Sequence, residues 1–157
     1  LVAMAADGAE AIALAADLRM TTADAQWSVL EAKWGLVPDM SGIQALSQQV
    51  RMDVAKRLTM TGEVVSGERA VDLGLASEVH ADPVAAATAF VEQVATRSPD
   101  AVAATKRLFG RTWSSSDRRT FARERVEQAK LLATRNTTIA REAAMKRVAP
   151  AFDPRRR

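Results

Sequence analysis

The sequence predicts an α/β segment over residues 1–81 followed by a helical segment over residues 82–157. Up to the pair Asp82-Pro83, short apolar stretches alternate with glycine, proline and aspartate, which is typical of short strands and helices joined by tight turns. After this pair, apolar residues recur at helical spacing almost to the end. Since no internal repeat and no proline-rich or Ser/Gly linker interrupts the chain, we expect these two segments and no further division.

The first segment contains short elements of both kinds. The alanine-rich run at residues 10–16 predicts a helix, whereas residues 18–21, 26–30 and 75–79 are short apolar stretches that predict strands. Residues 35–42 predict a loop, because two glycines and a proline interrupt any regular period.

Two further helices of this segment are predicted from their end signals. Asp53 is the expected N-cap of a helix over residues 54–60, which Gly62 ends. Ser66 is the expected N-cap of a shorter helix that Gly74 closes.

Start signals are clear in the second segment. Asp82-Pro83 and Ser98-Pro99 each pair a good N-cap with proline at the first helical position, and Gly110 is the expected stop of the second of these helices. A capping box formed by Ser114 and Asp117 predicts a third helix with apolar residues along one side. A last helix is expected at residues 138–146.

Composition excludes several classes of protein. Hydrophobic residues make up 48% and charged residues 26%, as in an ordinary globular protein, and the longest apolar run, residues 11–16, is too short to cross a bilayer. No basic segment precedes an apolar stretch at the start, so we expect a cytoplasmic protein that contacts no membrane. Without cysteine, and with His80 as the only histidine, no metal centre is expected.

Nucleic acid is not an expected partner. The net charge of +3 is modest, there is no tyrosine, and the aromatic share is 4%, which leaves few rings for base stacking. The basic residues are still suited to an anionic cofactor such as a nucleotide phosphate.

Five segments, in order, resemble the enoyl-CoA hydratase/isomerase (crotonase) family. They are IALAADLRM, SVLEAKWGLVPDMSG, AKRLTMTGEVVSGERAVDLGLASEV, SPDAVAATKRL and KRVAPAF, and together they cover nearly the whole chain. No single segment is specific, but the ordered set is hard to produce by chance.

This resemblance implies a ClpP/crotonase-like ββα spiral, truncated at the N-terminus, followed by a helical C-terminal trimerisation region. It also implies an acyl-CoA thioester substrate, no cofactor beyond the coenzyme A of that substrate, and a homo-oligomer, either a trimer or a hexamer. In the family two backbone N–H groups stabilise the thioester oxygen as it becomes an enolate. By resemblance one of these donors is Gly8, and the other belongs to the absent N-terminal part.

The chain departs from the family around Gly8. Asp7 and Ala9 flank Gly8 where the family has glycines, and Ala11 stands where hydratases have their first catalytic glutamate. Glu10 would point about 100° away on the same helix and is no simple replacement. The missing carboxylate favours an isomerase or a weakened hydratase.

Glu31 and Asp39 are the candidate catalytic residues. Glu31 aligns with the family's second acid/base glutamate; the alternative is a surface carboxylate paired with Lys33. Asp39 occupies a loop position where some relatives have a working aspartate; the alternative is a cap for the helix that begins after Ser41.

Three residues are candidates for substrate binding. Trp34 could line an acyl pocket or simply pack. Lys146 and Phe152 resemble the family's terminal segment, which reaches the nucleotide of coenzyme A on a neighbouring subunit, although the match needs one extra residue between Arg147 and Phe152.

Two hypotheses follow. The first is an enzyme that hydrates or isomerises an enoyl-CoA. The second is a catalytically silent fragment or assembly module built on the trimerising helices, because one wall of a site cannot orient a substrate alone.

Overall fold

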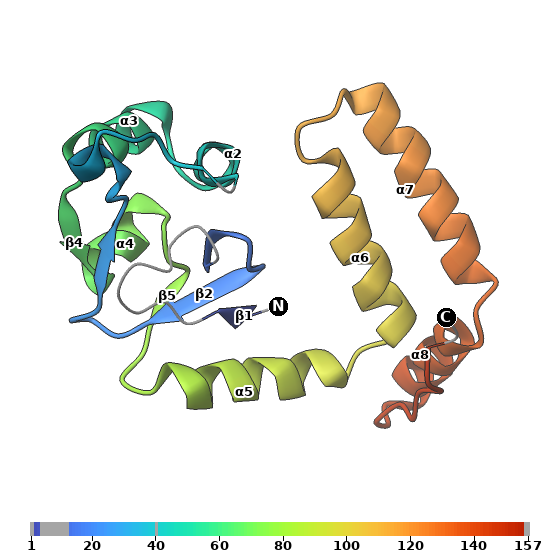
Figure 1. Ribbon diagram of the computed structural model, residues 1–157. Helices are drawn as coiled ribbons and strands as arrows, with labels where there is room; N and C mark the ends of the chain where they lie inside the picture. The colour runs from blue at the N-terminus through green and yellow to red at the C-terminus, as the bar shows by residue number, and fades with distance from the viewer. Residues whose placement is uncertain (1, 4–12, 40, 156–157) are drawn as a thin grey trace. The chain divides into compact units, whose positions relative to one another are not determined.

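The computed structural model describes residues 2–3, 13–39 and 41–155. These residues form two compact units, Leu1–Ala89 and Phe90–Arg157, which are described separately (Figure 1).

Five short strands form two sheets in the first unit. Strands β1 (Val2–Ala3), β2 (Leu18–Thr21) and β5 (Glu78–Val79) form a parallel sheet in the order β1-β2-β5. Strands β3 (Gln26–Ser28) and β4 (Val64–Ser66) form an antiparallel pair. The central strand β2 is mostly buried, as expected for a parallel strand covered on both faces.

Short helices connect these strands. They are the 3₁₀ turn η1 (Glu31–Trp34) and the α-helices α2 (Gly42–Gln49), α3 (Met52–Thr61) and α4 (Gly67–Leu73). The fully buried side chains that hold them together come from β3, α2, α3 and α4, and include Trp27, Leu46, Leu58 and Ala70.

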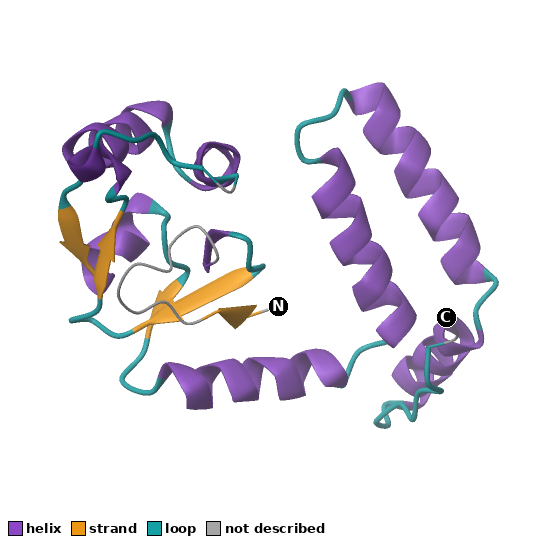
Figure 2. Ribbon diagram, in the orientation of Figure 1, coloured by secondary structure: helices purple, strands orange, loops and turns teal. Residues whose placement is uncertain are grey.

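Apart from the C-terminal tail, the second unit is helical (Figure 2). Its helices are α6 (Pro99–Thr112), α7 (Asp117–Leu132) and α8 (Arg135–Lys146), preceded by the end of α5 (Pro83–Ala95), the helix in which the two units meet along the chain. Helices α6 and α7 run antiparallel and pack side by side, and α7 buries no residue fully.

Several local predictions are confirmed. Strand β2 has the predicted bounds, and the Ser66 hydroxyl accepts a hydrogen bond from the N–H of Arg69 at the start of α4. Gly62 and Gly74 close their helices with φ of 60° and 87°, the left-handed conformation that favours glycine.

Other local predictions are wrong. Helix α6 continues through Gly110 to Thr112, because nothing crowds the chain there and the helix still packs on α7. The N-cap of α3 is Arg51, and Asp53 instead pairs with the Arg51 guanidinium at 3.1 Å. The N-cap of α7 is Ser116, not Ser114.

The remaining differences concern element bounds. The third predicted strand is reduced to β5, and α8 begins at Arg135, after a Thr134 cap. Of the helix predicted at residues 10–16, residues 10–12 lie outside the described part, and Ala13 and Leu14 are helical.

Candidate functional site

Glu31 is held by a tight backbone turn directly after β3. Its carbonyl accepts a hydrogen bond from the N–H of Leu36 at 3.0 Å, and Gly35, with φ of 71°, closes the turn. The Glu31 side chain is half-buried. Among the described residues, this side chain has no hydrogen-bond or ion-pair partner.

The alternative of a surface ion pair with Lys33 finds no support. A Cβ placed on Gly62 would lie 3.4 Å from the Cγ of Lys33, so the stem of Lys33 runs along the end of α3. No ion pair joins Lys33 to Glu31 within the described part of the chain. Consequently Lys33 does not neutralise the candidate acid.

Asp39 contacts the start of α2 through its backbone. Its carbonyl accepts a hydrogen bond from the N–H of Gly42 at 2.7 Å. The N-cap position of α2 is Ser41, with φ of 70°, and no side chain caps this helix. The exposed carboxylate of Asp39 therefore does not provide the expected cap.

Exposed apolar side chains follow Glu31 directly. Trp34 is 77% exposed, Leu36 65% and Val37 76%, and we call these three residues the apolar loop. Trp34 therefore does not pack in a core formed by the described residues. Because adjacent exposed apolar side chains mark binding sites or interfaces, the apolar loop is suited to an acyl chain or to a second protein surface.

The oxyanion donor expected at Gly8 lies outside the described residues, as do Glu10 and Ala11. Their roles stay predictions.

The terminal candidates lie in the second unit. Lys146 ends α8 and pairs with Glu142 at 3.8 Å, with both side chains mostly exposed. Phe152 is half-buried and lines a hollow of about 600 Å³ together with Val102 and Lys106 of α6. The structure thus places Phe152 against α6 and Lys146 beside a carboxylate of its own helix.

A buried amide holds the segment that carries Phe152. Asn136 is 3% exposed; its Nδ2 donates to Asp100 Oδ2 at 2.8 Å and to the Asp153 carbonyl at 3.0 Å. The N–H of Asp153 donates to Asn136 Oδ1 at 2.9 Å. Sequence reasoning missed this contact, since an asparagine in the first turn of a helix carries no signal for partners far along the chain.

Sequence reasoning also missed Arg19. This arginine of β2 is 4% exposed, and its guanidinium donates to the carbonyls of Leu75 and Ala16 and to the side chain of Gln49. Burial lowers the pKa of Arg19 from its ordinary value. The Arg19 side chain thus joins β2 to the segment before β5 and to the end of α2.

Within the described residues, no three histidine, cysteine, aspartate or glutamate side chains gather as metal ligands. None of the helices there combines the length and apolar character needed to cross a bilayer.

A family model described as enoyl-CoA hydratase/isomerase matches residues 3–153. The (E)-benzylidenesuccinyl-CoA hydratase of Thauera aromatica is 36% identical over 105 residues, which cover 65% of this chain and 41% of that relative. The carnitinyl-CoA dehydratase of Proteus mirabilis is 30% identical over 103 residues, covering 64% of this chain and 40% of the relative.

Solved structures of enoyl-CoA hydratases have the same fold as this chain. An enoyl-CoA hydratase from Mycobacterium tuberculosis H37Rv superposes with a TM-score of 0.87 at 30% identity, covering 97% of this chain and 60% of that one. An enoyl-CoA hydratase from Polaromonas sp. JS666 superposes with a TM-score of 0.87 at 28% identity, over 96% of this chain and 59% of that one.

The fold is thus that of the crotonases, truncated relative to these structures. The chain belongs to the enoyl-CoA hydratase/isomerase family. It spans 41% of the Thauera hydratase and 60% of the Mycobacterium tuberculosis enzyme.

Proposed function

We propose that this chain contributes one wall of an acyl-CoA site, in which Glu31 exchanges a proton with the carbon next to the thioester carbonyl. The observation that carries the proposal is the unpaired Glu31 carboxylate, held by a backbone turn and followed by the apolar loop. A positioned carboxylate transfers protons efficiently, and an apolar neighbour suits an acyl chain. Membership of the family supports an acyl-CoA thioester as the substrate.

The other groups have supporting roles in this proposal. Gly8 is the helix-side oxyanion donor, and Asp39 is a second proton carrier whose carboxylate caps no helix. Trp34 contacts the acyl chain, while Lys146 and Phe152 contact the nucleotide of coenzyme A. No cofactor beyond coenzyme A is needed for proton transfer. Since Ala11 cannot activate water, double-bond isomerisation or weak hydration is the favoured reaction.

Assembly is part of the same proposal. Helix α7 leaves Phe121, Val126 and Leu132 more than half exposed, and such apolar area favours association with a second copy. We therefore propose a homo-oligomer, a trimer or hexamer, in the cytoplasm. A monomer in light scattering at micromolar concentration would contradict this assembly.

The test of Glu31 uses two proteins: the 157-residue chain, and this chain joined to the N-terminal segment that the family resemblance implies. In the longer protein, Glu31→Gln keeps size and polarity but cannot transfer a proton. We expect turnover of an enoyl-CoA to fall by about two to four orders of magnitude with KM nearly kept. The matched control is Glu68→Gln, an exposed glutamate of α4, which should leave turnover unchanged. Full activity of Glu31→Gln would remove the proposal.

Asp39 and Ala11 are tested in the same background. Asp39→Asn should abolish isomerisation and spare residual hydration, whereas Ala11→Glu should raise hydration specifically. Unchanged hydration in a folded Ala11→Glu protein would show that the alignment around Gly8 is wrong.

The second candidate function is that of a catalytically silent assembly module. The short span of the chain relative to its relatives favours it, because one wall cannot orient a substrate. It predicts that the 157-residue chain has no activity even with Glu31 intact, although this chain still oligomerises.

A further inference from the structure

A basic groove lies between α6 and α7, in the second unit. It has a volume of about 420 Å³ and its charged lining is Arg107 and Arg111 of α6 with Arg119, Arg123, Glu127 and Lys130 of α7. Five cationic side chains thus share the groove with one carboxylate. We call it the α6–α7 groove.

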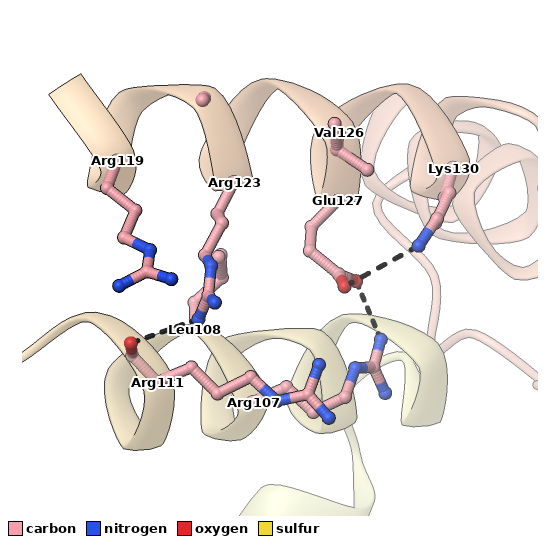
Figure 3. A pocket seen from close by; sticks show the side chains of 9 residues that line it. Arg107, Leu108, Arg111, Arg119, Arg123, Val126, Glu127 and Lys130 are labelled. Carbon is pink, nitrogen blue, oxygen red and sulfur yellow. Dashed lines mark hydrogen bonds and ion pairs between the residues drawn. The ribbon is translucent and has the colours of Figure 1, made fainter.

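One end of the α6–α7 groove is neutralised internally. Arg107 Nη2 lies 2.7 Å from Glu127 Oε2, and Lys130 Nζ lies 3.8 Å from Glu127 Oε1 (Figure 3). The hydrogen bond from Arg107 lowers the pKa of Glu127 and raises that of Arg107. The Arg107 guanidinium is thus directed at α7.

The other end is lined by two arginines of α7. Arg119 and Arg123 point from α7 toward α6, and Arg123 Nη1 donates to the backbone carbonyl of Arg111 at 3.0 Å (Figure 3). Among the described residues, no carboxylate lies within ion-pair distance of Arg119 or Arg123, whereas Arg111 interacts electrostatically with Glu127 and helps to lower its pKa. The guanidinium groups of Arg119 and Arg123 are therefore the two in the groove that have no ion-pair partner in this part of the chain.

This arrangement is unfavourable in the absence of a ligand. Arg119 and Arg123 are four residues apart on α7, as Arg107 and Arg111 are on α6, and like charges at this spacing destabilise a helix. Leu108, Ala122 and Val126 supply the apolar contacts in the groove lining, so packing alone does not call for arginines there. The convergence of arginines from both helices is what binding an anion requires.

We propose that the α6–α7 groove binds a phosphate or diphosphate group through Arg119 and Arg123 of α7. Guanidinium groups stay charged at every physiological pH, and their paired N–H donors match phosphate oxygens. Two guanidinium groups one helical turn apart in a small groove suit a compact, multiply charged anion, whereas an acidic protein segment would need a longer cationic row. The site uses none of the residues assigned to thioester chemistry, so it stands independently of Glu31.

The test measures binding of inorganic diphosphate to the 157-residue chain by titration calorimetry. Arg119→Ala/Arg123→Ala should weaken binding by about tenfold or more, because two charge-assisted contacts are lost. The matched control, Arg118→Ala/Arg125→Ala, removes the same charge from two exposed arginines of α7 outside the groove lining and should change the affinity less than about twofold. Equal weakening by both pairs, or no binding to the parent chain, would overturn the proposal.

A second variant is expected to bind diphosphate more tightly, which a partly unfolded protein would not do. Glu127→Gln removes the internal carboxylate and leaves Arg107 and Lys130 for the ligand, so diphosphate should bind about threefold tighter or more. Unchanged or weaker binding by a Glu127→Gln chain of normal helix content would contradict the site.

Further ligands distinguish the sources of phosphate. Equal affinity for diphosphate, ADP and coenzyme A identifies the phosphate groups alone as the ligand, and tighter binding of coenzyme A identifies the acyl carrier as the source. If the groove instead takes carboxylates of a second copy, diphosphate will not bind and Arg119→Ala/Arg123→Ala will lower the molar mass in sedimentation, which would refute the proposal.

Discussion

Replacement of Arg19 by methionine is the sharpest test of how the first unit is held together. The Arg19 guanidinium donates to the Leu75 carbonyl at 2.5 Å, to the Ala16 carbonyl at 3.0 Å and to Gln49 Oε1 at 2.9 Å. No carboxylate contacts it among the described residues, so its charge is compensated by these dipoles. Methionine has a similar length but donates nothing, so the two buried carbonyls and the partly buried Gln49 oxygen lose this donor.

The expected loss can be bounded. A hydrogen bond to a charged group contributes about 1.5–3 kcal/mol to stability, and three such bonds are lost in the variant. Part of this loss is offset, because the variant no longer has to remove a guanidinium from water on folding. We therefore expect the free energy of unfolding to fall by about 3–5 kcal/mol. Since small domains are stable by about 5–15 kcal/mol, the variant would lose a large part of its stability.

Urea unfolding followed by tryptophan fluorescence measures this loss. Trp27 is fully buried in the first unit, and the other two tryptophans, Trp34 and Trp113, are 77% and 66% exposed. Replacing these two by phenylalanine leaves Trp27 as the only reporter.

The control for this experiment is Arg69→Met, because the Arg69 side chain is 51% exposed and its guanidinium pairs with Asp72 at 3.5 Å. It should change the free energy of unfolding by less than about 1 kcal/mol. If Arg19→Met did no more than this control, the reasoning about Arg19 would be refuted.

Three further predictions follow from the described contacts. Asn136→Ala should lower the stability of the second unit by about 2–3 kcal/mol in thermal unfolding, because a buried carboxylate contact and two backbone bonds are lost. Gly67→Ala should lower stability by about 2–4 kcal/mol, because its Cβ would lie 1.8 Å from the Thr22 carbonyl oxygen; Gly110→Ala, with nothing within 4 Å, should raise stability by about 0.5–1 kcal/mol in the same assay. The pKa of Glu127 is lowered in the folded protein, so its contribution to stability is present above its ordinary value of 4.5 and is lost as the pH falls through the folded-state pKa; Glu127→Gln should flatten this acid limb in helix content measured against pH.

Local elements were predictable where the signal is local. The Ser66 hydroxyl and the glycines at 62 and 74 act on backbone groups within a few residues, so their roles can be read along the chain. Gly110 was misread because a glycine in a helix ends it only if the chain turns away there, and packing of α6 on α7 continues past it.

The candidate site was predictable only in part. The order of five segments identified the family, and with it Glu31 and Asp39, but nothing in the sequence showed that the Lys33 stem lies along the end of α3 or that Asp39 meets α2 through its carbonyl. These contacts form only when the turn after β3, the loop that follows it and helices α2 and α3 have all reached their folded positions.

The sequence by itself determined the family, the two kinds of segment and most helix ends, because each depends on periodicity or on neighbours within a turn. Only the tertiary structure decided which charged and polar groups meet. Arg19 bonds across 56 residues to Leu75, Asn136 across 36 to Asp100, and Arg107 across 20 to Glu127. The partner of a side chain is set by how the backbone between the two residues folds, and arginines of α6 and α7 line one groove only because these two helices pack side by side.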